Sequence, residues 1–301
     1  MIRELVRFVL RSTARGPLVE ALPPENRWSA IPARIFRAGG RVAGLFLTRD
    51  AKAAIQDWLI NRFRIKVAWQ APGLEACLSD ALRWLAEARP KGGELGDYLE
   101  FGVYQGNTLI AMHQVLEKSP KAPRMRLFGF DSFEGLPPEA AQEGGVWSPG
   151  QYRCEREFTE ARLAEAGVKQ ERVKLVQGFY ADSLTPTLPA ELGIKRAGIV
   201  MIDCDLYSST REALEFCRPL FGERTVILFD DWHSTGEEAG EKRAFRELLA
   251  AEPGLAAEEV PAYHSNGAVF RLTREVSRHG DVGRADAGPA AVLAEYVAVE
   301  R

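Results

Sequence analysis

The sequence predicts an α/β fold of the doubly wound, Rossmann-like type, with a mostly parallel sheet and an N-terminal helical extension. Two apolar runs rich in β-branched residues, 199–202 and 226–229, are typical of central strands that are buried on both faces. The segment between them, 207–220, fits one helix, and a parallel crossover of this kind places both strand ends on the same edge of the sheet. Strands and helices continue to alternate from residue 98 to residue 272.

Apolar runs and helical periodicity predict each element in turn. We expect strands at 98–101, 126–130, 173–176, 199–202, 226–229, about 259–263, and 268–272. We expect helices at 51–66, 74–88, 107–117, 158–166, 207–220, 241–251 and 290–299. Ser209 and Glu212 are predicted to open the helix at 207–220 as a capping box. The long loop 132–156 is predicted to be a lid, in which Trp147 and Tyr152 either close over a site or pin the loop.

Length and composition indicate one large α/β domain with appendages. The chain has 301 residues, of which 46% are apolar and 27% charged, and its net charge is -3. The predicted divisions are a helical extension at 1–90, the main domain at 91–275 and a tail at 276–301. The basic N-terminal part is predicted to pack on the core or on a second subunit, with a membrane surface or another partner as the alternative. We therefore expect a homo-oligomer.

Cysteine usage and hydropathy favour a cytoplasmic protein. The four cysteines are scattered without a CxxC pair or metal-ligand spacing, which is typical of reduced thiols. No uninterrupted apolar core follows the basic start, and no run approaches the length of a membrane span, so neither a signal peptide nor stable membrane insertion is expected. The small net charge gives no indication of a nucleic-acid partner.

Acidic residues follow each of the two central strands. Asp203 and Asp205 come after the first strand, and Asp230 and Asp231 come after the second. Because parallel strands end at the same edge, the four carboxylates are predicted to converge on one crevice. Their mutual repulsion predicts either a bound cation or a proton shared between groups.

A glycine-containing turn follows the first strand of the sheet. Gly102 and Gly106 allow a ligand to approach the backbone at the start of a helix, whose free N–H groups favour anionic or polar ligands. The dinucleotide pattern GxGxxG is not met, because Tyr104 stands where its second glycine belongs. Asp131 ends the neighbouring strand and is placed to bond ribose hydroxyls. The turn and the acid together predict a nucleoside-like ligand at the strand ends.

Five segments resemble motifs of the macrocin O-methyltransferase family, in the same order: 100–108, 128–137, 178–184, 203–210 and 229–232. The resemblance covers about residues 95–272. It implies a seven-stranded class I methyltransferase sheet, S-adenosylmethionine as the methyl donor, Mg²⁺ as the metal ion, and a sugar hydroxyl on a glycosylated natural product or saccharide as the acceptor.

The resemblance also implies roles for individual residues. The residues implied to bind the methionine part of the cofactor, or to lie near it, are Glu100, Gly102, Gly106 and Thr108. The residues implied to bind or lie near its nucleoside part are Asp131 for the ribose, Ser132 and Phe133 near the adenine, and Asp182 at the adenine edge. Asp203, Asp230 and Asp231 are implied to hold Mg²⁺, with Asp205 as the general base. His233, next to the aspartate pair, is the alternative base or a substrate contact.

The chemistry of methyl transfer suits these residue types. An unactivated sugar hydroxyl is a poor nucleophile, but a hard cation ligated by carboxylates lowers its pKa, and a further carboxylate accepts its proton. Two residues depart from the commonest family pattern: Cys204 between the aspartates and Trp232 after the aspartate pair. Neither removes a metal ligand, and both are predicted to affect the acceptor pocket.

Three other functions fit parts of the pattern. A metal-dependent nucleotide-sugar glycosyltransferase also uses an Asp-x-Asp after an apolar strand, but it does not explain the glycine turn or the second aspartate pair. A catechol-type O-methyltransferase shares the cofactor and the metal, but such enzymes usually carry Asp-Asn where this chain has Asp230-Asp231. A non-catalytic module that binds S-adenosylmethionine, or docks through the basic N-terminus, leaves the intact carboxylates without a role.

Overall fold

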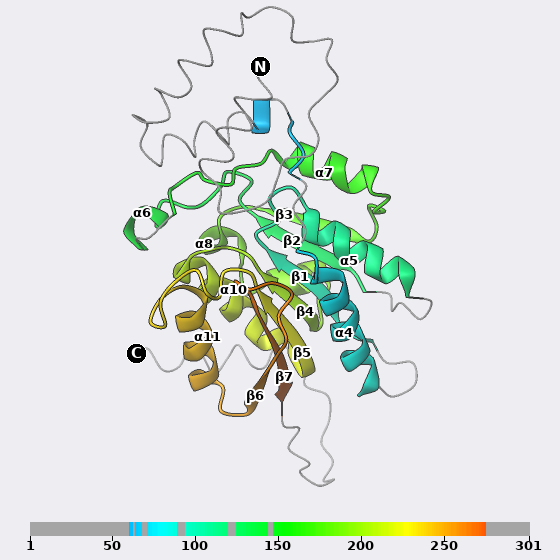
Figure 1. The fold of residues 1–301 in the computed structure, drawn as a ribbon, viewed down its shortest axis with the longest axis vertical. Coiled ribbons are helices and arrows are strands. Elements are labelled where there is room, and N and C mark those ends of the chain that lie inside the picture. Colours follow the sequence, from blue (N-terminus) through cyan, green and yellow to red (C-terminus); the bar gives the residue numbers. More distant parts are fainter. Residues whose placement is uncertain are drawn as a thin grey trace, which may run out of the picture.

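The structure is a computed structural model that describes residues 60–62, 64–67, 71–88, 94–119, 125–143 and 147–274. Within these ranges the chain forms one sheet with helices on both faces (Figure 1). Most of the predicted N-terminal extension, the predicted helix at 290–299 and the tail lie outside the described residues. The predicted divisions at residues 90 and 275, and the homo-oligomer, therefore stay predictions.

The sheet has seven strands in the order β3-β2-β1-β4-β5-β7-β6. Their bounds are β1 (Asp97–Phe101), β2 (Leu127–Asp131), β3 (Val173–Gln177), β4 (Ala197–Ile202), β5 (Phe221–Phe229), β6 (Leu255–Val260) and β7 (Ala268–Arg274). Strands β1 to β5 are parallel, and β7 runs antiparallel to both β5 and β6. The predicted seven-stranded, mostly parallel sheet is confirmed.

Two apolar layers cover the sheet, because successive side chains of a strand point to opposite faces. Ile199 and Met201 face a cluster that includes Leu78 of α4 (Leu74–Glu87) and Met112 of α5 (Asn107–Lys118). The intervening residues of β4 face a second cluster, which contains the apolar sides of α10 (Tyr207–Cys217) and α11 (Gly240–Ala251). Figure 1 shows α4 and α5 on one side of the sheet and α10 and α11 on the other. The remaining helices are α6 (Ala140–Glu143), α7 (Arg156–Glu165), α8 (Tyr180–Ser183), α9 (Leu188–Leu192) and the 3₁₀ helix Arg218–Leu220.

Several predicted boundaries are wrong. The strand expected at 226–229 is β5, which begins earlier, at Phe221. The strand expected at about 259–263 is β6, Leu255–Val260, an edge strand with four consecutive exposed residues and therefore without the alternation that marks a half-buried strand. The helix expected at 207–220 changes to a 3₁₀ turn after Cys217, where Pro219 removes a backbone donor. The helix expected at 51–66 has ended by Arg64, whose φ is +47°.

The predicted capping box of α10 is also wrong. The helix begins at Tyr207, two residues before Ser209, so the Ser209 hydroxyl lies within the first turn and caps nothing. Instead, the carboxylate of Glu143 accepts hydrogen bonds from the backbone N–H groups of Tyr207 (2.7 Å) and Ser208 (2.9 Å). The helix is thus capped by a residue that lies about sixty positions earlier in the chain.

Glu143 belongs to the loop that was predicted to be a lid. The two legs of this loop are joined at the base, where Leu136 N–H donates to the Gln151 carbonyl and Gly150 N–H donates to the Leu136 carbonyl, both at 2.8 Å. On the second leg, the ring of Tyr152 lies between the rings of Trp147 and Tyr104. The loop therefore contacts the glycine turn through Tyr104 and the start of α10 through Glu143.

The segment 64–67 is docked on the glycine turn. The buried side chain of Gln105 donates to the carbonyl of Ile65 (3.0 Å) and accepts from the N–H of Val67 (2.9 Å). Asn107 donates to the carbonyl of Val67 (3.1 Å), and Arg162 of α7 donates to Gln105. Among the residues described, no helix combines the length and the apolar character needed to cross a membrane.

We predict that Glu143→Ala lowers the free energy of unfolding by roughly 1 kcal/mol, because the first two N–H groups of α10 lose their acceptor. The measurement is urea unfolding followed by circular dichroism. Glu139→Ala, an exposed change in the same loop, is the matched control and is expected to have little effect. Equal losses in the two variants would contradict the assignment of Glu143 as the cap.

Candidate active site

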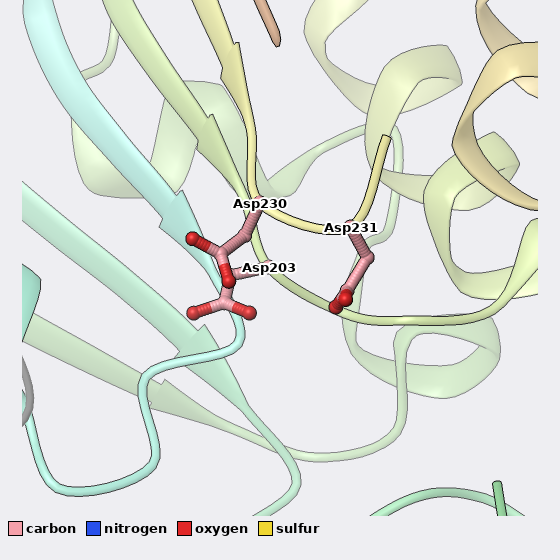
Figure 2. Close-up of side chains that lie close together, drawn as sticks. All are labelled: Asp203, Asp230 and Asp231. Carbon is pink, nitrogen blue, oxygen red and sulfur yellow. The ribbon is translucent and has the colours of Figure 1, made fainter. Parts of the chain in front are cut away.

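The aspartates that follow β4 and β5 meet at one edge of the sheet. Each of Asp203, Asp230 and Asp231 offers one carboxylate oxygen to a group whose members all lie within 4.8 Å of one another. Figure 2 shows the Asp203 and Asp230 carboxylates facing each other, with Asp231 to one side. The convergence of these three predicted metal ligands is as the parallel crossover required.

Backbone hydrogen bonds fix the positions of these aspartates. The N–H of Asp203 donates to the Phe101 carbonyl (2.8 Å), and the N–H of Asp230 donates to the Ile202 carbonyl (3.0 Å). Gly102 has φ +90°, and a Cβ built there would lie 1.7 Å from the carbonyl oxygen of Asp203. Gly102 is thus required by the close approach of β4, which ties the glycine turn to the aspartate site.

Two further carboxylates complete the acidic cluster. Asp205, at φ +64°, is 8% exposed and lies in hydrogen-bonding contact with the side chain of Asp231. Glu241, in the first turn of α11, is 1% exposed and accepts the backbone N–H of Asp231 (3.1 Å), while its other oxygen is buried without a partner among the described residues. Glu241 was not singled out from the sequence.

Burial and mutual repulsion favour the protonated forms of Asp203, Asp205 and Asp231. Burial, followed by the charge of Asp230, raises the pKa of Asp203 well above its ordinary range. Burial, followed by the charge of Asp231, raises the pKa of Asp205 in the same way, and burial also raises the pKa of Asp231. Without a counter-charge, the group resists carrying its full negative charge.

Cationic side chains do not balance this charge. Within the described ranges, no ion pair joins a lysine or arginine to any of these aspartates, and the one ion-pair contact is that of His264 with Asp230. The converging carboxylate oxygens of Asp203, Asp230 and Asp231 form a donor set that suits a hard divalent cation such as Mg²⁺. The residues present therefore fit the metal that the family resemblance implies.

Hydrogen-bond donors from the β6–β7 turn surround the aspartate pair, and the sequence reading missed them. The Tyr263 hydroxyl donates to Asp230 Oδ1 (2.6 Å), and His264 Nε2 lies 2.9 Å from the same oxygen. The Asn266 amide donates to Asp231 Oδ1 (3.1 Å) and to the Asp230 carbonyl (3.2 Å). The sequence does show a polar turn before β7. Only the pairing of β7 with β5, however, brings this turn next to the aspartates that follow β5.

The cofactor half of the site begins at Glu100 on β1. Its side chain is 1% exposed and accepts a hydrogen bond from the Tyr98 hydroxyl (2.7 Å). Burial raises the pKa of Glu100 from 4.5 to about 8. Glu100 is therefore a buried carboxyl that holds a proton near neutral pH.

Asp131 organises the glycine turn through the backbone. Its Oδ2 accepts the N–H groups of Val103 and Tyr104, both at 2.8 Å, and its Oδ1 accepts the N–H of Phe133 at 2.6 Å. Burial raises the pKa of Asp131, and these three hydrogen bonds act in the opposite direction. The residue predicted to bind ribose thus already shapes the turn on which a nucleoside would lie.

The other predicted cofactor residues are distributed around this turn. Gly106, at φ +76°, is the N-cap of α5, and Thr108 lies buried in the first turn of that helix. The Ser132 hydroxyl donates to the Gly135 carbonyl (2.7 Å), and Phe133 is packed in the apolar cluster under α5. Asp182 is exposed on α8. The first four lie at or beside the turn after β1, whereas Asp182 lies farther along, after β3.

The remaining candidates differ in their surroundings. His233 is exposed, and its backbone N–H donates to the Asn266 carbonyl (2.9 Å). Cys204 is buried with its sulfur 3.6 Å from Thr210 Oγ1, and Trp232 packs against Phe270 and neighbouring rings. Cys204 is therefore a core residue and Trp232 a partly buried residue packed against the core, and their effect on an acceptor pocket stays a prediction.

Comparisons with known proteins agree with this arrangement. The pattern of the Macrocin-O-methyltransferase (TylF) family matches residues 80–254, more than half of the chain. The 8-demethyl-8-(2,3-dimethoxy-alpha-L-rhamnosyl)-tetracenomycin-C 4'-O-methyltransferase of Streptomyces olivaceus is 29% identical over 190 residues, covering 61% of this chain and 70% of the relative. The mycinamicin III 3''-O-methyltransferase of Micromonospora griseorubida is 22% identical over 211 residues, covering 66% and 78%.

Solved structures support the fold. CalS11, a calicheamicin methyltransferase, superposes with a TM-score of 0.53 at 19% identity, covering 84% of this chain and 98% of its own. The O-methyltransferase NovP superposes with a TM-score of 0.52 at 21% identity, covering 67% and 78%. Both likenesses place this chain among proteins of the methyltransferase fold.

We predict that the stability of the metal-free protein falls as pH rises from about 5 to about 8. Between the ordinary pKa of 4.5 and the folded value of about 8, Glu100 holds its proton only in the folded state, so folding takes up a proton and raising the pH opposes it. The raised pKa values of Asp203 and Asp205 act in the same direction. Urea unfolding with a chelator present measures the slope.

Glu100→Gln is expected to reduce this slope without abolishing it, because glutamine still accepts the Tyr98 hydroxyl but does not titrate. Glu117→Gln, an exposed change on α5, serves as the control. A Glu100→Gln variant with the same pH dependence as the wild type would show that Glu100 ionises normally in the fold.

Proposed function

Because this chain belongs to the macrocin O-methyltransferase family, whose members are S-adenosylmethionine-dependent O-methyltransferases, we propose that it methylates a sugar hydroxyl of a glycosylated natural product with the help of Mg²⁺. The names of its relatives support the acceptor class, since one acts on a rhamnosylated tetracenomycin and another on mycinamicin III. A nucleotide-sugar glycosyltransferase does not fit this family membership. The Asp230-Asp231 pair continues to argue against a catechol acceptor.

The observation that supports the proposal most strongly is the contact between the glycine turn and Asp203, which follows β4. Gly102, in the turn that follows β1, lies directly against the backbone of Asp203. A cofactor seated on that turn would therefore lie next to the three converging aspartates. This proximity is what transfer of a methyl group to a metal-oriented hydroxyl requires.

The metal half of the site would position and activate the acceptor. Asp203, Asp230 and Asp231 would hold the cation, and Glu241 accepts the backbone N–H of Asp231. When bound, S-adenosylmethionine supplies an electrophilic methyl group, and Mg²⁺ lowers the pKa of the acceptor hydroxyl and orients it. Asp205, in contact with Asp231, would accept the hydroxyl proton on a carboxylate oxygen. His233 is the alternative base.

The cofactor half would hold the donor rigidly. We assign the methionine part to Glu100, Gly102, Gly106 and Thr108. We assign the ribose and adenine to Asp131, Ser132, Phe133 and Asp182. Asp131 has each oxygen already bonded to backbone N–H groups, so a ribose hydroxyl would share a carboxylate whose orientation is set in advance. Such preorganisation limits the entropy lost on binding.

The loop that carries Trp147 and Tyr152 would cover the acceptor. Tyr152 is 40% exposed and lies edge-on to Tyr104 in the glycine turn, with ring centroids 6.1 Å apart. Exposed aromatic faces are well suited to contact a sugar ring or an apolar aglycone. Glu143, in the middle of the loop, holds it to the start of α10, which follows the Asp203–Asp205 segment.

We predict that Asp203→Asn and Asp230→Asn each lower kcat by about 100-fold or more, since each removes a charged metal ligand. Their affinity for S-adenosylhomocysteine, measured by calorimetry, is expected to stay within about threefold of the wild type. Asp131→Asn is expected to show the reverse pattern, with weakened cofactor binding, because it disturbs the hydrogen bonds that shape the turn. Parallel loss of both functions in all three variants would indicate damage to the fold.

We predict that a chelator abolishes methyl transfer and that added Mg²⁺ restores it, because the clustered aspartates lack a lysine or arginine partner among the described residues. The assay is methylation of a rhamnoside acceptor followed by mass spectrometry, with a catechol as the comparison acceptor. Full activity in the presence of the chelator would rule out the metal-dependent mechanism. Methylation of the catechol in preference to the rhamnoside would rule out the proposed acceptor.

A further inference from the structure

The β6–β7 turn supplies two hydrogen bonds to one oxygen of a proposed metal ligand. Tyr263 and His264 both contact Asp230 Oδ1, at 2.6 Å and 2.9 Å. Among the described residues, no hydrogen bond reaches the other oxygen, Oδ2. Two donors that converge on one oxygen fix the plane of a carboxylate and leave its second oxygen available.

The contacts of His264 also define which ring nitrogen carries the proton. His264 Nδ1 accepts the backbone N–H of Asn266 at 3.1 Å, so this nitrogen presents a lone pair. The proton therefore resides on Nε2, which faces Asp230 and donates to it. The imidazole acts as a donor toward the carboxylate, as the Tyr263 hydroxyl does.

The turn is built to hold these donors in place. Gly267 lies against the His264 ring and the Phe229 carbonyl, at 3.1 Å and 2.7 Å from a Cβ built on it, so a side chain here would displace one or the other. On the other side, Gly73 at the start of α4 packs against the backbone of Tyr263. The rings of Tyr263 and His264 meet edge to face with centroids 4.4 Å apart. Both donors are thus held by packing as well as by hydrogen bonds.

Asp231 is oriented from the same turn. The Ser234 hydroxyl donates to Asp231 Oδ1 (2.6 Å), and the Asn266 amide donates to that oxygen (3.1 Å) and to the Ser234 hydroxyl (2.8 Å). Asn266 therefore connects the His264 ring, the backbone of Asp230 and the side chain of Asp231. One short turn controls the orientation of both aspartates that follow β5.

We propose that Tyr263 and His264 are positioning residues that turn Asp230 Oδ2 toward the cation, and that Asn266 does the same for Asp231. This inference rests on the proposed metal-dependent function and adds to it the residues that set the affinity for the metal. Partners of this kind, which orient metal ligands, typically change metal affinity by 10–100-fold when they are removed. Their loss is expected to weaken metal binding and to leave the cofactor turn intact.

The test is titration of the full-length protein with Mn²⁺, followed by electron paramagnetic resonance, which measures the metal Kd without any turnover. Tyr263→Phe and His264→Leu are each expected to weaken Mn²⁺ binding by about 10-fold or more. His264→Gln keeps an N–H donor at nearly the position of Nε2, and it is expected to bind Mn²⁺ within about threefold of the wild type. Calorimetry with S-adenosylhomocysteine is expected to give the same Kd for all of these variants.

Two matched controls separate positioning from general destabilisation. Tyr207→Phe removes a hydroxyl that donates to Glu247 (2.7 Å) on the outer side of α11, and His113→Asn removes a buried imidazole on α5. Both are expected to bind Mn²⁺ like the wild type. Unchanged Mn²⁺ affinity in Tyr263→Phe and His264→Leu would overturn the inference, as would equal weakening in the controls.

A different result would refute the proposed metal site itself. If the wild type binds no Mn²⁺, or if Asp203→Asn binds Mn²⁺ as well as the wild type does, the proposed metal site is wrong. The positioning roles then fail with it. If the wild type binds Mn²⁺ through Asp203 but the variants of the β6–β7 turn bind it equally well, only the positioning roles fail. The two failures are therefore distinguished by the wild type and Asp203→Asn alone.

Discussion

The proposed active site depends on carboxylates that the backbone of the sheet holds close enough together to repel one another strongly. Asp203 and Asp230 continue the hydrogen-bond ladder beyond the ends of β4 and β5, so they cannot move apart without breaking strand pairing. Their repulsion is not relieved by lysine or arginine within the part of the chain that the structure describes. Because this edge of the sheet is both rigid and acidic, the repulsion between its carboxylates can be relieved by binding a divalent cation.

The same rigidity joins the two halves of the site. Gly102 lets β4 approach the turn after β1, and Asp131 secures that turn through three backbone hydrogen bonds. Donor and acceptor would therefore meet at a distance set by the spacing of neighbouring strands. Because the spacing of paired strands varies little, the geometry of methyl transfer would be inherited from the sheet and not from flexible loops.

Local patterns predicted the sheet and the acidic ends of its strands, because buried parallel strands and helical periodicity leave clear signals in the sequence. The capping of α10 by Glu143 was missed, since a long-range acceptor leaves no pattern near the helix that it caps. The edge strand β6 was predicted too late in the chain, because its exposed residues, such as Glu258, lack the alternation of buried and exposed positions that marks a half-buried strand. The role of His264 depended on the antiparallel return of β7, which spacing along the chain does not reveal.

The buried amide of Gln105 has a consequence for the extent of the folded unit. Its nitrogen donates to Ile65 and its oxygen accepts from Val67, although the family pattern begins only at residue 80. A chain trimmed to residues 80–254 would leave that amide nitrogen without its carbonyl, within the turn that we propose binds the methyl donor. The folded unit of this protein accordingly includes residues 65–67, which precede the start of the family pattern.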